Sequence, residues 1–142
     1  MATVFAKLNL KDHKQIVVLG PPGTFERELA ALEGVEVIRD LKKAKQLTFS
    51  LAFVTAPEQV DALAPELARK AEGDAILWFA YPTRTSRRYK SQIDRDNGWN
   101  VLGHEGFEPV RMVAIDEDWS AKRFRRASFI KNMTRPRSYR LT

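Results

Sequence analysis

Four positively charged side chains gather in one short segment, residues 83–91. They are Arg84, Arg87, Arg88 and Lys90, and they are interleaved with Ser86 and Tyr89. Arginine binds phosphate through paired N–H donors, and a tyrosine ring can stack on a base. Because like charges held this close repel one another, the segment predicts a site for a phosphate-bearing or otherwise anionic ligand. The alternative is internal pairing with Asp94, Asp96 or the acidic run 116–118.

Three consecutive acidic residues, Asp116, Glu117 and Asp118, form a second candidate site. Clustered carboxylates can bind a hard cation or raise one another's pKa, which suits acid–base chemistry. Asp116 and Asp118 are therefore candidates for a general base or a cation ligand. The alternative is a charged hairpin turn that pairs with Arg123 or Arg125.

Residues 20–24 read Gly-Pro-Pro-Gly-Thr and join an expected strand to an expected helix. This turn resembles the opening of the phosphate-binding loop of ATPases, whose pattern is Gly-x-x-x-x-Gly-Lys-Ser/Thr. The closing positions are instead Phe25, Glu26 and Arg27. A carboxylate at the lysine position would repel the phosphate, so ATP hydrolysis by this loop is excluded. Amides at a helix N-terminus can still bind a small anion. The candidate ligand contacts, beside the alternative of a structural turn, are Gly20, Gly23 and Thr24.

Apolar segments of strand length precede each candidate site. Residues 75–81 are apolar on both faces, which is typical of a central strand covered by helices on each side. Further strands are expected at residues 15–20, 35–38, 47–54 and 110–115. Residues 119–129 are expected to return as an antiparallel hairpin, with a helix as the competing interpretation. Because ligands bind beyond the carboxyl ends of parallel strands, the three candidate segments are predicted to share one edge.

Helical segments alternate with these strands. Thr24 is expected to cap a helix that reaches Leu32, and Thr55 with Glu58 to form a capping box for the next one. Pro65 is expected to kink or divide that second helix, because an internal proline costs about 3 kcal/mol. The alternation predicts a three-layer, Rossmann-like α/β domain. Its sheet is expected to be mostly parallel, with about five strands and a C-terminal antiparallel hairpin.

Length and composition narrow the class of protein. The 142 residues predict a single domain over residues 1–130, followed by a basic C-terminal tail over residues 131–142. The lack of cysteine excludes disulfides and thiolate chemistry. His13 and His104 lack partners at ligand spacing, so no metal site is predicted. No apolar run approaches the roughly 20 residues of a membrane helix, and a cytoplasmic protein without membrane contact is expected.

Positive charge is concentrated in the second half of the chain. The net charge is +6, and residues 82–142 hold 14 Lys and Arg against 7 Asp and Glu. This asymmetry favours an anionic partner, either a small molecule or the phosphates of nucleic acid. The alternative is a solvated basic face.

Four segments are distinctive: residues 77–82 (Leu-Trp-Phe-Ala-Tyr-Pro), 85–90 (Thr-Ser-Arg-Arg-Tyr-Lys), 95–99 (Arg-Asp-Asn-Gly-Trp) and 114–120 (Ala-Ile-Asp-Glu-Asp-Trp-Ser). Together they resemble an uncharacterised family of small bacterial proteins, a domain of unknown function, over about residues 7–135. The resemblance implies a bacterial origin and a single domain, and it brings no activity. The outline is also similar to class I methyltransferase-type Rossmann domains, although only Gly20 and Gly23 match their glycine-rich cofactor turn.

The sequence leads to three hypotheses about function. The first is binding of an anionic ligand at the carboxyl-end edge of the sheet. The second is a small enzyme that uses Asp116 or Asp118 as a base or cation ligand. The third is an interaction protein whose basic face meets nucleic acid or an acidic partner. Cofactor, reaction and oligomeric state do not follow from the sequence.

Overall fold

The computed structural model describes residues 4–87, 89–93 and 98–130. Its centre is a sheet of six strands in the order β2-β1-β3-β4-β6-β5. The strands are β1 (Gln15–Leu19), β2 (Glu36–Ile38), β3 (Leu47–Phe53), β4 (Ala71–Pro82), β5 (Phe107–Ala114) and β6 (Trp119–Arg126). The first four strands are parallel to one another, and β6 runs antiparallel to both β4 and β5. The predicted mostly parallel sheet with a terminal antiparallel hairpin is confirmed, with six strands rather than about five.

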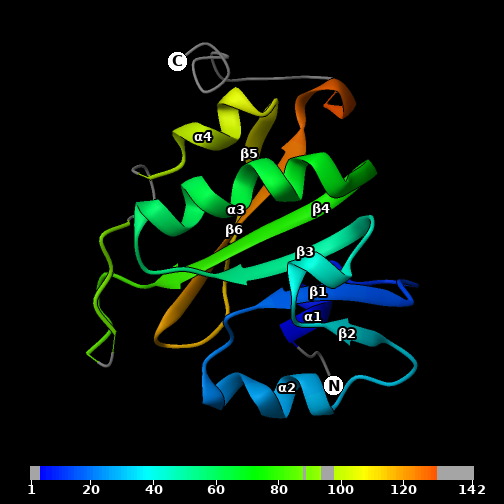
Figure 1. Cartoon of the computed structure of the whole chain (residues 1–142). Helices are drawn as coiled ribbons and strands as arrows, with labels where there is room; N and C mark the ends of the chain where they lie inside the picture. Colours follow the sequence, from blue (N-terminus) through cyan, green and yellow to red (C-terminus); the bar gives the residue numbers. More distant parts are fainter. Residues whose placement is uncertain (1–3, 88, 94–97, 131–142) are drawn as a thin grey trace.

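Helices cover both faces of this sheet (Figure 1). One face carries α3 (Pro57–Lys70) and α4 (Asn100–His104), and the other carries α1 (Val4–Lys7), the 3-10 turn η1 (Gly23–Phe25) and α2 (Glu26–Ala30). Two further 3-10 turns are η2 (Leu41–Lys43) and η3 (Ala127–Phe129). The three predicted layers are therefore present. Among the described residues, no helix has both the length and the apolar character that crossing a membrane requires.

Strand β4 connects two hydrophobic clusters. Leu77 and Phe79 belong to the cluster under α3 and α4, whereas Ile76 and Trp78 belong to the cluster on the opposite face. Successive side chains of a strand point to opposite faces, so a strand that is apolar throughout is stable only between two covering layers. Every residue from 75 to 82 is buried, which confirms the predicted central strand.

The segment after the first strand differs from its prediction. Thr24 lies inside η1, and neither η1 nor the following α2 has a side-chain cap. The prediction that Thr24 caps a helix reaching Leu32 is therefore wrong. The ring of Phe25 packs between those of Phe5 and Phe53, at centroid distances of 5.6 and 5.0 Å. This tertiary packing favours a tight turn at residues 23–25 in place of a regular first helical turn.

Helix α3 is continuous over its 14 residues, with Pro65 inside it. The expected division into two short helices is therefore wrong, and the expected kink stays a prediction. Val60, Ala64 and Leu67 are fully buried against the sheet. Burial of a valine or leucine side chain is worth about 1.5–3 kcal/mol, so a few such residues offset the cost of about 3 kcal/mol for an internal proline.

The start of α3 is capped by a residue other than those expected. The side-chain oxygen Oε1 of Gln59 accepts hydrogen bonds from the backbone amides of Thr55, at 2.6 Å, and Ala56, at 3.1 Å. Thr55 precedes the N-cap residue, which is Ala56. The predicted capping box of Thr55 with Glu58 is therefore one residue out of register. The N-cap is Ala56 in place of Thr55, and Gln59 in place of Glu58 accepts the backbone amides.

Candidate functional site

The basic loop begins where β4 ends at Pro82, at the carboxyl end of the parallel strands. Its first residue, Thr83, donates its backbone amide to the carbonyl of Asp118 at 2.8 Å and its hydroxyl to the carbonyl of Glu117 at 3.1 Å. Beyond the loop, the amide of Gln92 donates to the carbonyl of Thr55 at 2.8 Å. Hydrogen bonds therefore hold both ends of the loop against the sheet edge.

Ser86 and Tyr89 hold the middle of the same loop. The Ser86 hydroxyl donates to Oδ1 of Asp118 at 2.8 Å and accepts the backbone amide of Tyr89 at 3.2 Å. The half-buried Tyr89 ring packs against Trp119, with centroids 4.9 Å apart. Tyr89 thus has a packing role in the structure, and its stacking on a ligand stays a prediction.

The basic residues Arg84, Arg87 and Lys90 of this loop are all exposed. None of them forms an ion pair with an acidic residue in the part of the chain that the structure describes. The predicted ligand residue Arg88, and the alternative counter-charges Asp94 and Asp96, lie outside the described residues.

The acidic run forms the turn between β5 and β6. Oδ1 of Asp116 accepts the backbone amides of Asp118, at 2.8 Å, and Trp119, at 2.9 Å. Asp118 accepts the Ser86 hydroxyl as described above. Arg125, one of the expected partners of this run, pairs instead with Asp74. The acidic turn is therefore held by backbone amides and a hydroxyl.

The turn at residues 20–24 approaches β3 closely. Gly20 has a φ of +63°, and a Cβ at this position would lie 3.3 Å from the carbonyl oxygen of Phe53. A side chain here would be strained both by the backbone conformation and by this contact. Gly20 is therefore explained by the turn itself.

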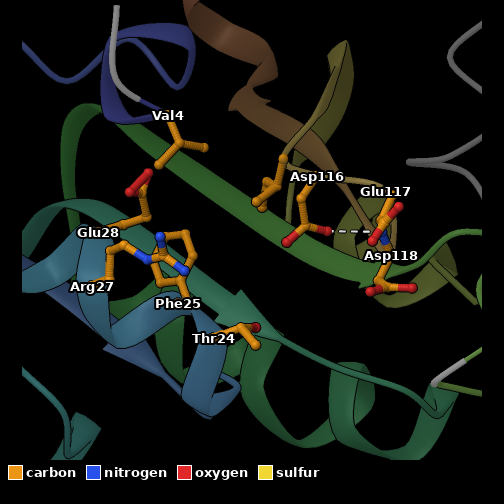
Figure 2. Close-up of a pocket in the computed structure, with 9 residues that line it drawn as sticks. Val4, Thr24, Phe25, Arg27, Glu28, Asp116, Glu117 and Asp118 are labelled. Atoms are coloured by element: carbon orange, nitrogen blue, oxygen red, sulfur yellow. Dashed lines mark hydrogen bonds between the residues drawn. The ribbon is translucent and has the colours of Figure 1, made fainter.

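A hollow of about 320 Å³ lies between this turn and the acidic turn. Figure 2 shows residues of η1 and α2 on one side and the acidic residues on the other, with Val4 above them. The hollow is lined by Val4, Thr24, Phe25, Arg27, Glu28, Ile115, Asp116, Glu117 and Asp118. Thr24 and the acidic run were predicted to share one edge of the sheet. In the structure they line the same hollow. Arg84, Arg87 and Lys90 are not among the lining residues.

The charge of the hollow is predominantly negative. Four of its side chains are carboxylic acids, and Arg27 is the one basic residue among those lining it. Such a lining favours a ligand group that is positively charged or that donates hydrogen bonds. Sequence reasoning missed the contribution of Arg27 and Glu28, although their proximity to Thr24 is a usable signal. Nothing in the sequence pattern indicates Val4.

No protein-family model matches the chain, and no curated protein sequence matches it either. Solved structures do match in fold. A SAM-dependent methyltransferase from Aquifex aeolicus has 14% identity and a TM-score of 0.60, with 87% of each chain covered. The Methanococcus jannaschii fibrillarin pre-rRNA processing protein has 16% identity and a TM-score of 0.54, covering 82% of this chain and 68% of that one.

A third similar structure is the magnesium protoporphyrin IX methyltransferase from Synechocystis PCC 6803 with bound SAH. It has 13% identity and a TM-score of 0.54, covering 87% of this chain and 78% of that one. At such identities the likeness shows the fold alone. The predicted similarity to the methyltransferase outline is confirmed at this level, and the resemblance to the small bacterial family stays a prediction. The chain has the Rossmann-like fold that SAM-dependent methyltransferases have.

Proposed function

We propose that this protein binds a phosphate-bearing or otherwise anionic ligand at the carboxyl-end edge of its sheet, through the loop at residues 83–91. The supporting observation is an anchored loop whose described basic residues form no ion pair with other described residues. Its ends and its Ser86 are held by hydrogen bonds, while Arg84, Arg87 and Lys90 are exposed. In the acidic turn beside the loop, the Asp116 carboxylate accepts two backbone amides. The Asp118 carboxylate accepts the Ser86 hydroxyl.

An anchored loop suits anion binding for an energetic reason. Ordering of a loop on binding reduces affinity, and a loop that is already held by its backbone avoids most of that cost. Guanidinium groups then provide planar pairs of donors that match phosphate oxygens. Exposed side chains in this position can reach a ligand without disrupting the core.

Arg87→Glu tests this proposal, because it replaces a donor by a repelling carboxylate on an exposed position. We expect phosphate-bearing ligands to bind at least about tenfold more weakly, which corresponds to about 1.4 kcal/mol. The melting temperature without ligand should stay nearly unchanged. Isothermal titration calorimetry against nucleotides, polyphosphate and short oligonucleotides at fixed ionic strength measures the affinity.

Lys45→Glu is the matched control. It makes the same change in charge at an exposed residue just before β3, at the opposite end of the parallel strands. Equal losses in both variants would mean that net charge alone attracts the ligands. Unchanged binding in Arg87→Glu would remove the loop from the site.

The acid-lined hollow favours a second candidate function, binding of a small molecule with a cationic group. Two similar structures, both of the magnesium protoporphyrin IX methyltransferase from Synechocystis PCC 6803, contain bound SAH and bound SAM. The sulfonium of adenosylmethionine (SAM) is positively charged. Here Asp116 uses Oδ1 for the two turn amides, and its second carboxylate oxygen accepts no hydrogen bond from the described residues. The small enzyme considered from the sequence would use this hollow, with Asp116 or Asp118 as base or cation ligand.

The same titration separates the two candidates when adenosylmethionine and adenosylhomocysteine are included. The acidic hollow predicts tighter binding of adenosylmethionine, whose sulfur is charged, and no dependence on Arg87. Binding of polyphosphate that depends on Arg87 supports the first candidate instead.

A further inference from the structure

The antiparallel hairpin of β5 and β6 places two arginines directly opposite each other. In the register of this hairpin, Pro109 pairs with Phe124, the ladder then shifts by one residue, and Arg111 pairs with Arg123. An extra residue in one strand reverses the faces of the residues that follow. The irregularity therefore brings Arg111 onto the same face as Arg123. In a regular ladder Arg111 would lie opposite Lys122.

This face is the one covered elsewhere by α1 and α2. Arg123 pairs with Trp78 of β4, and Trp78 belongs to the cluster beneath those helices. Arg111 is exposed and Arg123 is half-buried. Solvent and ligands therefore have access to Arg111, on the edge strand β5, and to part of the Arg123 side chain beside it.

Asp74, whose negative charge acts on Arg123, is committed to another arginine. Asp74 receives hydrogen bonds from Nε of Arg125 at 2.8 Å and from Nη2 at 2.6 Å. Neither Arg111 nor Arg123 forms an ion pair with a described residue. Like charges that face each other across two strands destabilise a sheet.

Burial increases the cost of this arrangement. Nε of Arg123 is buried and has no hydrogen-bond partner among the described residues. Burial lowers the pKa of Arg123, and the charges of Arg125 and Arg111 lower it further, against the opposing effect of Asp74. Arginine nevertheless keeps its proton in proteins. An unsatisfied buried donor that carries charge is stabilised by an anion.

We propose that Arg111 and Arg123 form an oxyanion site that binds a phosphate group. Two guanidinium groups on one face can bind the oxygens of a single phosphate, and phosphate neutralises the repulsion between them. The phosphate belongs either to a small molecule or to a phosphodiester backbone. This site is distinct from the loop at residues 83–91. Arg123 lies opposite Trp78, four residues before Pro82, which is about 13 Å along an extended strand.

Thermal unfolding in inorganic phosphate and in sodium chloride of equal ionic strength tests the site. We expect phosphate to raise the melting temperature of the wild type more than chloride does. Arg111→Gln should melt at a higher temperature than the wild type without phosphate, because the like-charge pair is gone. It should also lose the phosphate-specific increase, with binding about tenfold weaker.

Two control variants and one further readout make this result specific. Arg69→Gln removes an exposed positive charge from α3, on the other face, and should keep the phosphate effect. Arg87→Glu should also keep the phosphate-specific rise in melting temperature. A failure of the loop site therefore leaves this rise unchanged, whereas a failure of the Arg111–Arg123 site removes its dependence on Arg111. If Arg123→Gln does not fold, the Nε–H resonance of Arg123 in the wild-type protein supplies the readout, and it should shift on addition of phosphate.

The source of the phosphate group is decided by competition. A short single-stranded oligonucleotide that displaces inorganic phosphate from the wild type, and not from Arg111→Gln, identifies a phosphodiester ligand. An oligonucleotide without effect identifies a small phosphate. An equal stabilisation by chloride, or phosphate binding that persists in both Arg111→Gln and Arg123→Gln, overturns the proposal.

Discussion

Asp74 forms an ion pair with Arg125. Its carboxylate and the guanidinium of Arg125 are joined by a contact of 2.6 Å, with about 35% of each side chain exposed. The hydrogen bond from Arg125 lowers the pKa of Asp74, and the positive charges of Arg125 and Arg123 act in the same direction, while burial opposes them. The ionised carboxylate is therefore favoured by folding.

The stabilisation by Asp74 should depend on pH. Because its pKa is lower in the folded state, its contribution is full above the unfolded-state pKa and disappears as pH falls through the folded-state value. We expect Asp74→Asn to lower the free energy of unfolding at pH 7 by about 1 kcal/mol or less, since solvent screens an exposed pair. Urea denaturation should show this deficit shrinking below about pH 4.

Asp12→Asn, at an exposed carboxylate, controls for the general effect of charge. Its difference from the wild type should be small at every pH. A deficit for Asp74→Asn that stays constant into acid would mean that packing, and not the ion pair, causes it.

The N-terminus of α3 shows what one side chain contributes to an element. Gln59 accepts both the Thr55 and the Ala56 amides, which otherwise have no partner within the helix. In a capping box, the side chain of the third helical residue accepts the backbone amide of the N-cap residue, and Gln59 does this here.

Gln59→Ala should therefore destabilise the protein by about 1 kcal/mol, as loss of a helix cap does. Glu58→Ala should cost only a few tenths of a kcal/mol, from its favourable position near the helix dipole. Chemical denaturation of the two variants measures the difference. A larger loss for Glu58→Ala would restore the capping assignment made from the sequence.

At the scale of the whole molecule, both hydrophobic clusters depend on one sheet. Residues of β4 alternate between them, so neither cluster can lose its packing without exposing the other side of the same strand. This arrangement predicts that the described chain unfolds as one cooperative unit.

Leu67→Ala and Leu8→Ala test that cooperativity, because these fully buried leucines lie in different clusters. Each should lower stability by about 2–5 kcal/mol. Far-ultraviolet circular dichroism and tryptophan fluorescence should give coincident unfolding curves in both variants. Separate transitions by the two probes would indicate that the clusters unfold independently.

The predictions that succeeded depend on periodicity and on sheet geometry. Apolar runs and alternation located the strands and the terminal hairpin, because burial on one or two faces leaves a direct mark on the sequence. The rule that ligands bind at the carboxyl ends of parallel strands placed Thr24 near the acidic run, and both line the hollow. The predicted caps at Thr24 and Thr55 and the predicted division of the helix at Pro65 were wrong, because tertiary packing outweighed the preferences of short motifs.

The sequence by itself determined the fold class, the central strand and the position of the basic loop after Pro82. Only the tertiary structure decided which charges have partners. Asp74 and Arg125 are 51 positions apart, and the pairing of Arg111 with Arg123 depends on one irregularity in a ladder. Burial of a strand is encoded locally by its own residue types. Pairing of charges depends on distances between segments that are far apart in the chain, so it is known only once the chain has folded.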